Sequence, residues 1–98
     1  MLTLPIKKKW FDMIKSGEKK EEYREIKPYY NSRFKKNCIK EIYYNPIREI
    51  IFRNGYSKNS PSIKCKVEIT EGYSKEKWGA EPNKMYYVLR ILDVEEVK

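Results

Sequence analysis

The sequence predicts a small α+β domain, with a curled, barrel-like sheet of five or six short strands, one N-terminal helix and a short second helix. Three observations lead to this fold class. The chain has 98 residues, 40% of them hydrophobic, which is enough for one small core and too little for two, so one domain over residues 1–98 is expected. Several short stretches alternate apolar and polar residues, as half-buried strands do. One stretch near the N-terminus has apolar residues at helical spacing instead.

The first two elements are a strand and a helix. Residues 2–6 alternate apolar and polar side chains, which is typical of a short strand with one buried face. Residues 7–16 are predicted to be helical because four apolar side chains form one stripe: Trp10, Phe11, Met13 and Ile14. We expect Trp10 and Phe11 to lie in the core. Gly17 stands where a helix commonly ends in a left-handed residue.

A second strand and a short helical turn are expected next. Residues 19–26 follow the period of two, which places Glu22 and Arg24 on one face and Lys19 on the other. Pro28 then opens a helical turn, because proline favours the first helical position.

The second half of the chain is predicted to be mostly strands. Residues 39–44 form either a short strand or the edge of a loop. Three further strands are expected over residues 47–53, 62–70 and 86–94. In the clearest of these, Cys65 is expected to face the core. The polar residues 71–84, between the last two of these strands, are expected to form a loop that holds Trp78.

The residue inventory excludes several kinds of chemistry. The chain has no histidine, which excludes histidine-based triads, His-ligated metals and a histidine general base. Its two cysteines, Cys38 and Cys65, stand far apart, so we expect no thiolate zinc site, no metal and no cofactor. No apolar run approaches the ~20 residues of a membrane span, and lysines at 7–9 interrupt the apolar N-terminus. A cytoplasmic protein without a membrane partner is therefore expected.

The positive charge is concentrated in one part of the chain. The net charge is +8, and residues 1–40 hold 12 Lys or Arg against 5 Asp or Glu, whereas residues 41–98 hold 10 against 9. A concentrated basic field attracts polyanions, nucleic acid first. Two other interpretations stay open. In the first, the many lysines reflect an AT-rich genome and only solvate the surface. In the second, the basic face binds acidic proteins.

The densest charged cluster is residues 17–24, at the predicted junction of helix and strand. Gly17 allows a sharp turn, after which Lys19 is free to swing over the start of the strand that carries Glu22 and Arg24. If this face of the strand lines a cleft, the three charged side chains can converge in it. The alternative is a solvated edge strand with a surface ion pair worth ~0–1 kcal/mol.

These residues resemble a known motif. Gly17, Lys19, Glu22 and Arg24 match the pattern Gly-x-Lys-x-x-Glu-x-Arg, which is similar to the signature of the ASCH domain in the PUA-like superfamily. The preceding helix with Trp10, and segments 52–56 and 86–92, also resemble compact bacterial and phage members. The resemblance implies a small PUA-like β-barrel with a cleft beside the first helix and an RNA-binding role.

The resemblance also implies an enzymatic alternative. Some members of the family are amidohydrolases that deacetylate N4-acetylcytidine, and others are described as ribonucleases. The lysine of their motif matches Lys19, but Glu22 stands where the amidohydrolases have a threonine nucleophile. The alternative function is therefore a metal-independent hydrolase acting on a modified nucleobase, a nucleoside or RNA. Its candidate catalytic residues are Lys19, as base or electrostatic stabiliser, Glu22, which would activate water, and Arg24.

Further residues are candidates for binding RNA or a modified nucleoside. Lys19 and Arg24 would contact a phosphate or a base edge. Arg53, Asn54 and Tyr56 flank a turn, where Asn54 would bind a base edge and Tyr56 would stack on the base. Alternatively, the Asn-Gly pair at positions 54–55 is present only because it tolerates the turn. Trp78 is either a stacking platform or a lid that fills the mouth of the barrel. We expect Asn54 or Tyr56 to lie near the cleft.

Overall fold

The computed structural model describes residues 1–34 and 47–97, which form a small α+β protein with five strands and two α-helices. In chain order the elements are β1 (Leu2–Pro5), α1 (Lys8–Ser16), β2 (Glu21–Glu25), α2 (Pro28–Phe34), β3 (Ile47–Arg53), β4 (Ser62–Tyr73), the short 3₁₀ helix η1 (Glu76–Trp78) and β5 (Met85–Val97). The predicted α+β class is confirmed. The strand or loop edge expected at residues 39–44 lies outside the described residues.

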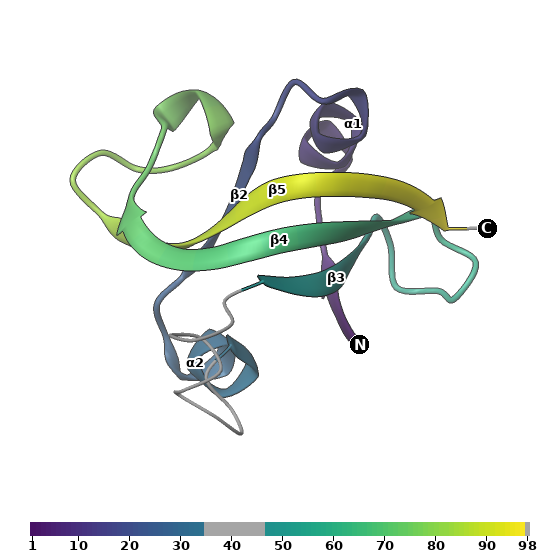
Figure 1. The fold of residues 1–98 in the computed structure, drawn as a ribbon, viewed down its shortest axis with the longest axis horizontal. Helices are drawn as coiled ribbons and strands as arrows, with labels where there is room; N and C mark the ends of the chain where they lie inside the picture. Colours follow the sequence, from purple (N-terminus) through teal and green to yellow (C-terminus); the bar gives the residue numbers. More distant parts are fainter. Residues whose placement is uncertain (35–46, 98) are drawn as a thin grey trace.

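The strands form one curled, mixed sheet in the order β1-β3-β4-β5-β2 (Figure 1). Strand β1 pairs with β3 in parallel, and the other neighbours are antiparallel. β1 and β2 are therefore the two edges of the sheet, and α1 joins them along the chain. The described strands make a half-barrel in which no backbone ladder joins β1 to β2.

The long β4–β5 hairpin extends beyond the strands that the sequence predicts. Residues 71–73, expected in a loop, belong to β4, because they pair with residues 85–87 of β5. The ladder shifts register between Lys66, opposite Asp93, and Val67, opposite Ile91, so Leu92 is an extra residue in a β-bulge. A bulge increases local twist and bends the strand, which suits a sheet that curls.

The core fills the inside of the curl. Alternate side chains of β4 are fully or almost fully buried, as their period of two predicts: Ile63, Cys65, Val67 and Ile69. Phe11 and Ile14 of α1 pack against this cluster. The expectation for Trp10 is confirmed only in part, because its ring is partly buried against the core and also lines a cleft.

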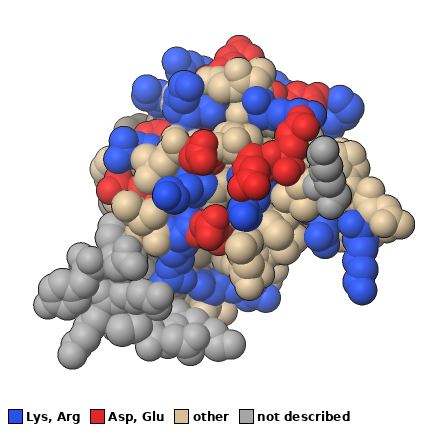
Figure 2. Space-filling model, turned by 45° about the vertical axis from the view of Figure 1, so that its right-hand side comes forward, with Lys and Arg blue, Asp and Glu red and all other residues tan. Residues whose placement is uncertain are grey.

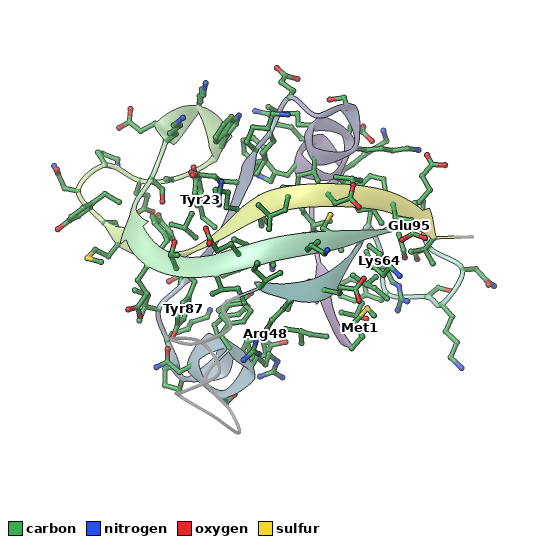
Figure 3. All side chains as sticks on the ribbon, viewed as in Figure 1. Met1, Tyr23, Arg48, Lys64, Tyr87 and Glu95 are labelled. Atoms are coloured by element: carbon green, nitrogen blue, oxygen red, sulfur yellow. The ribbon has the colours of Figure 1, made fainter. Side chains whose placement is uncertain are left out.

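Helix α2 packs on the sheet through aromatic rings. Phe34 is buried, and its ring meets the ring of Tyr87 edge-on with the centroids 4.9 Å apart. Tyr87 points toward α2 (Figure 3), where its hydroxyl donates a hydrogen bond to Asn31 Oδ1. These contacts hold α2 against β5, next to the strand that carries Glu22 and Arg24.

Neither α-helix in the described part of the chain has the length and apolar character of a membrane span. The longer one, α1, has nine residues, whereas a span needs ~20.

Cys65 is expected to be inert in the folded protein. Its side chain is fully buried in the core, and burial raises the pKa of the thiol to about 12. Because the thiolate is the reactive form, iodoacetamide should alkylate Cys65 only after denaturation, as measured by mass spectrometry of the Cys65 peptide. Equal labelling with and without denaturant would contradict this burial.

Candidate functional site

A cleft of about 450 Å³ opens between the start of α1, strand β2 and the segment that follows β4. Its walls come from four parts of the chain, namely residues 5–10, 19–27, 30 and 78–86. The structure brings together here four residues that the sequence singled out: Lys19, Glu22, Arg24 and Trp78. Because Trp78 lies more than 50 residues from the other three, the cleft depends on the tertiary fold.

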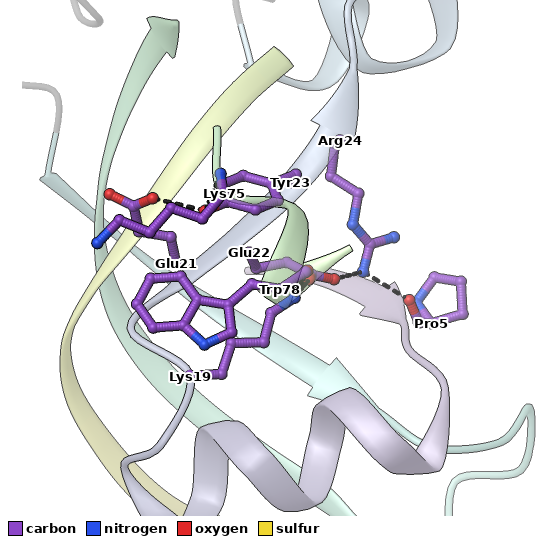
Figure 4. Close-up of polar contacts among 8 residues, drawn as sticks. All are labelled: Pro5, Lys19, Glu21, Glu22, Tyr23, Arg24, Lys75 and Trp78. Carbon is purple, nitrogen blue, oxygen red and sulfur yellow. Dashed lines mark hydrogen bonds and ion pairs between the residues drawn. The ribbon is translucent and has the colours of Figure 1, made fainter. Parts of the chain in front are cut away.

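Lys19 is the most deeply buried of the charged residues, with 1% of its surface exposed. Its Nζ forms an ion pair with Glu22 Oε1 at 3.0 Å and donates a hydrogen bond to the backbone carbonyl of Trp78 at 2.5 Å (Figure 4). The same ammonium lies 4.1 Å from the ring centroid of Trp10. A buried cation that is surrounded by acceptors and a ring face is held in one position.

The helix end decides where Lys19 points. Gly17 ends α1 with a left-handed φ of 86°, and the backbone N–H of Lys19 then donates to the carbonyl of Met13. Regular pairing of β2 begins only at Glu21. Lys19 therefore precedes the alternation that would send its side chain to the opposite face, and it reaches Glu22.

Glu22 lies between two cations. Its Oε1 contacts Lys19, and its Oε2 accepts from Arg24 Nη2 at 2.7 Å. Only 7% of its side chain is exposed. The three groups carry one negative and two positive charges, so the buried cluster has a surplus of one positive charge at the cleft.

Arg24 connects the two edges of the sheet. From β2, its Nη2 also donates to the carbonyl of Pro5 in β1 at 2.8 Å (Figure 4). Its Nη1 donates to the hydroxyl of Tyr30 at 3.2 Å. Its Nε is buried and has no hydrogen-bond partner among the described residues. A side chain thus closes the half-barrel where the backbone ladder is absent, and it keeps one donor unused.

Burial lowers the pKa of Lys19 below its usual value, although the neighbouring Glu22 opposes this shift. Removing an ammonium from water disfavours its charged form, and a carboxylate at hydrogen-bond distance favours it. Glu22 is therefore the group that retains the proton on Lys19.

Aromatic rings make up much of the remaining wall. Within the described ranges, five aromatic residues line the cleft: Trp10, Tyr23, Tyr30, Trp78 and Tyr86. The hydroxyl of Tyr23 donates to Glu21 at 2.7 Å and accepts from the backbone of Lys75, and burial raises its pKa above the usual range. Sequence reasoning missed Trp10, Tyr23, Tyr30 and Tyr86 as parts of a site. Periodicity shows which residues share a face, but it does not show which face borders a cleft.

Trp78 was expected to be a stacking platform or a lid. Its ring is buried and lines the cleft, its carbonyl accepts from Lys19, and Gly79 follows it with a φ of 101°. Trp78 is therefore part of the wall beside Lys19.

Three sequence candidates lie outside the cleft. Arg53 Nε donates to Ser62 Oγ at 3.1 Å, and Tyr56 is 95% exposed in the β3–β4 connection. The side-chain amide of Asn54 donates to the carbonyl of Ile6 at 2.9 Å; Ile6 lines the cleft, whereas Asn54 does not. The expectation that Asn54 or Tyr56 lies near the cleft therefore holds for Asn54 only through Ile6, and neither side chain lines the cleft. The positive φ of Gly55, 130°, fits the turn interpretation of these residues.

Basic and acidic side chains alternate over the face of the molecule shown in Figure 2. On the sheet, Lys64 lies between Glu49 and Glu95, with its Nζ 3.6 and 3.4 Å from their carboxylate oxygens. The surplus charge of the chain therefore does not make this face uniformly basic. Among the described residues, no group of three or more His, Cys, Asp or Glu could hold a metal ion.

Comparisons with models of known protein families, with curated proteins and with solved structures found no match to this chain. The class of this protein is therefore defined by its fold and its candidate site. The protein is a small α+β half-barrel with a cleft that combines buried cations with aromatic rings.

Proposed function

We propose that this protein binds single-stranded RNA and takes one unstacked nucleotide into the cleft. The observation that carries the proposal is the pairing of aromatic rings with the positively charged Lys19–Glu22–Arg24 cluster in a cleft of about 450 Å³. Proteins recognise single-stranded RNA by stacking splayed bases on aromatic rings and by hydrogen bonds to base edges and phosphates. The resemblance of residues 17–24 to the ASCH motif supports the same proposal.

Each group in the cleft has a role in this proposal. Glu22 holds the two cations in place, and the hydroxyl of Tyr30, which accepts from Arg24, keeps its own proton to donate to the ligand. At the rim, Lys7 forms no ion pair with the described residues, whereas Lys84 contacts Glu25 at 3.6 Å. Lys7 is therefore the rim cation that is available to a phosphate.

The geometry favours binding over hydrolysis. Both carboxylate oxygens of Glu22 are engaged by cations, and a general base needs a free lone pair directed at water. Among the described residues that line the cleft there is no serine, threonine or cysteine to act as a nucleophile. The observation that keeps hydrolysis as the second candidate is the lowered pKa of Lys19 beside a carboxylate.

We expect a fluorescently labelled uridine 10-mer to bind the protein, with an affinity that falls as salt rises, because phosphate contacts release counterions. Arg24→Lys should weaken binding by about 10- to 150-fold, the equivalent of one hydrogen bond to a charged group (about 1.5–3 kcal/mol), since an ammonium cannot replace the planar fork that bonds Glu22, Pro5 and Tyr30. Fluorescence anisotropy measures both effects. Arg90→Lys is the matched control, because Arg90 pairs with Glu68 away from the cleft.

Three outcomes would count against parts of the proposal. No binding even at low salt would refute it. Unchanged binding by Arg24→Lys with unchanged melting would remove Arg24 from the site. Turnover of N4-acetylcytidine by the wild type, lost in Lys19→Met, would favour the hydrolase instead.

A further inference from the structure

Three exposed lysines stand over the two tryptophans of the cleft. Lys9 of α1 holds its Nζ 4.6 Å from the ring centroid of Trp10. Lys75 and Lys77, at η1, hold theirs 4.8 and 4.6 Å from the ring centroid of Trp78. Contacts of this kind steady an ammonium while leaving it open to solvent. We call Lys9, Lys75 and Lys77 the lysine trio.

The lysine trio adjoins the cleft because the two elements that carry it meet there. Trp10 and Trp78 both line the cleft. Gly79, directly after η1, lies so close to Trp10 that a Cβ on this glycine would be 3.0 Å from Cζ2 of the ring. Lysines from α1 and η1, far apart in sequence, therefore lie over two tryptophans that both line the cleft.

The lysine trio differs from neighbouring lysines in its pairing. Lys8 is bound by Asp12 at 2.7 Å, and Lys15 by Glu96 at 2.8 Å. No member of the trio forms an ion pair with an acidic side chain of the described residues, and one acidic residue, Glu76, lies between Lys75 and Lys77 in the chain. The trio therefore retains most of its charge for an external anion.

We propose that the RNA strand continues out of the cleft across Trp10 and Trp78, and that the lysine trio binds its flanking phosphates. This inference rests on the proposed function and deepens it, since it assigns the flanking phosphates of the strand to the lysine trio. The cleft takes one nucleotide, and the trio contacts the backbone of its neighbours. Charge complementarity favours a polyanion that follows a row of cations, and the adjoining cleft with its aromatic walls favours RNA over an acidic protein.

The test removes one lysine from each element, in the variant Lys9→Gln/Lys77→Gln. Binding of a labelled uridine 10-mer is measured at several salt concentrations, and binding of uridine 5′-monophosphate is measured beside it. In the variant, the slope of log affinity against log salt should shrink by about 1.4, since each phosphate contact contributes about 0.7 for single strands. Affinity for uridine 5′-monophosphate should stay at the wild-type value.

Two controls make the result specific. Lys58→Gln/Lys66→Gln removes the same charge from exposed lysines elsewhere and should leave the slope unchanged. Lys9→Arg/Lys77→Arg keeps the charges and should restore the wild-type slope, which a merely structural role of the lysines would not predict.

Several results would overturn the inference. If the 10-mer slope of Lys9→Gln/Lys77→Gln equals that of the wild type while both bind uridine 5′-monophosphate, the trio does not contact the strand, and the cleft proposal stands. If the wild type binds neither probe, the proposed function fails together with the inference. An equal change of slope in Lys58→Gln/Lys66→Gln would show that only the net charge of the protein matters. A poly-glutamate peptide that binds as tightly as the 10-mer would favour an acidic protein partner.

Discussion

Replacing Glu22 by alanine should lower the free energy of unfolding by about 3–5 kcal/mol, the largest effect that we expect from one substitution. Glu22 is the carboxylate between Lys19 and Arg24, and its side chain is 7% exposed. Without it, the two buried cations lose their counter-ion, and keeping both charged or removing the proton from Lys19 costs free energy. Urea denaturation followed by circular dichroism measures the loss.

The matched control is Glu68→Ala. Glu68 pairs with Arg90 at 2.8 Å, but both side chains are partly exposed, so this substitution should cost less than about 1 kcal/mol. A further variant, Lys19→Met/Glu22→Leu/Arg24→Met, replaces the whole buried cluster by apolar side chains and should recover much of the loss. Similar losses for Glu22→Ala and Glu68→Ala would show that the cluster is not the buried charge system described above.

Gly79→Ala should lower the free energy of unfolding by about 1–2 kcal/mol through backbone strain alone. Gly79 has a φ of 101°, a left-handed conformation that is strained for any residue with a Cβ. Crowding adds to the strain, since the new methyl group would lie 3.0 Å from Cζ2 of Trp10. The ring of Trp10 must give way by a few tenths of an ångström, which disturbs its contact with the Lys19 ammonium. Urea denaturation gives the stability change, and tryptophan fluorescence reports the shift of the ring.

Gly72→Ala is the control for this prediction. Gly72 lies in β4 without a positive φ, and a Cβ there would meet no heavy atom within 4 Å. Its replacement should leave stability unchanged or raise it by up to ~1 kcal/mol, since alanine restricts the unfolded chain. If the two substitutions had the same effect, the close approach of Gly79 to Trp10 would have no energetic consequence.

The local elements of this protein could be predicted because they depend on neighbours in the chain. Apolar side chains at helical spacing, followed by Gly17, mark α1 and its end. The β-branched run of residues 47–53 marks β3 at both bounds, and alternation marks the part of β4 that faces the core. The ends of the long hairpin could not be predicted, since residues 71–73 are strand only because β5 pairs with them.

The candidate site, too, could be predicted only in part from the sequence. The period of two placed Glu22 and Arg24 on one face, and the glycine turn explained why Lys19 reaches them. The partners that complete the site are the carbonyl of Trp78, 59 residues after Lys19, and the carbonyl of Pro5, 19 residues before Arg24. No local pattern identifies a backbone carbonyl as a partner of a distant cation.

The sequence by itself determined the fold class, the helix and strand that carry the charged motif, and the shared face of Glu22 and Arg24. The tertiary structure alone decided that the sheet curls until Arg24 reaches from β2 to β1, that Trp10 borders a cleft, and that Asn54 bonds Ile6 instead. The physical reason is the range of the interactions. Periodicity and turn chemistry act between residues close in the chain, whereas a cleft forms only where the packing of the whole sheet brings distant side chains and carbonyls together.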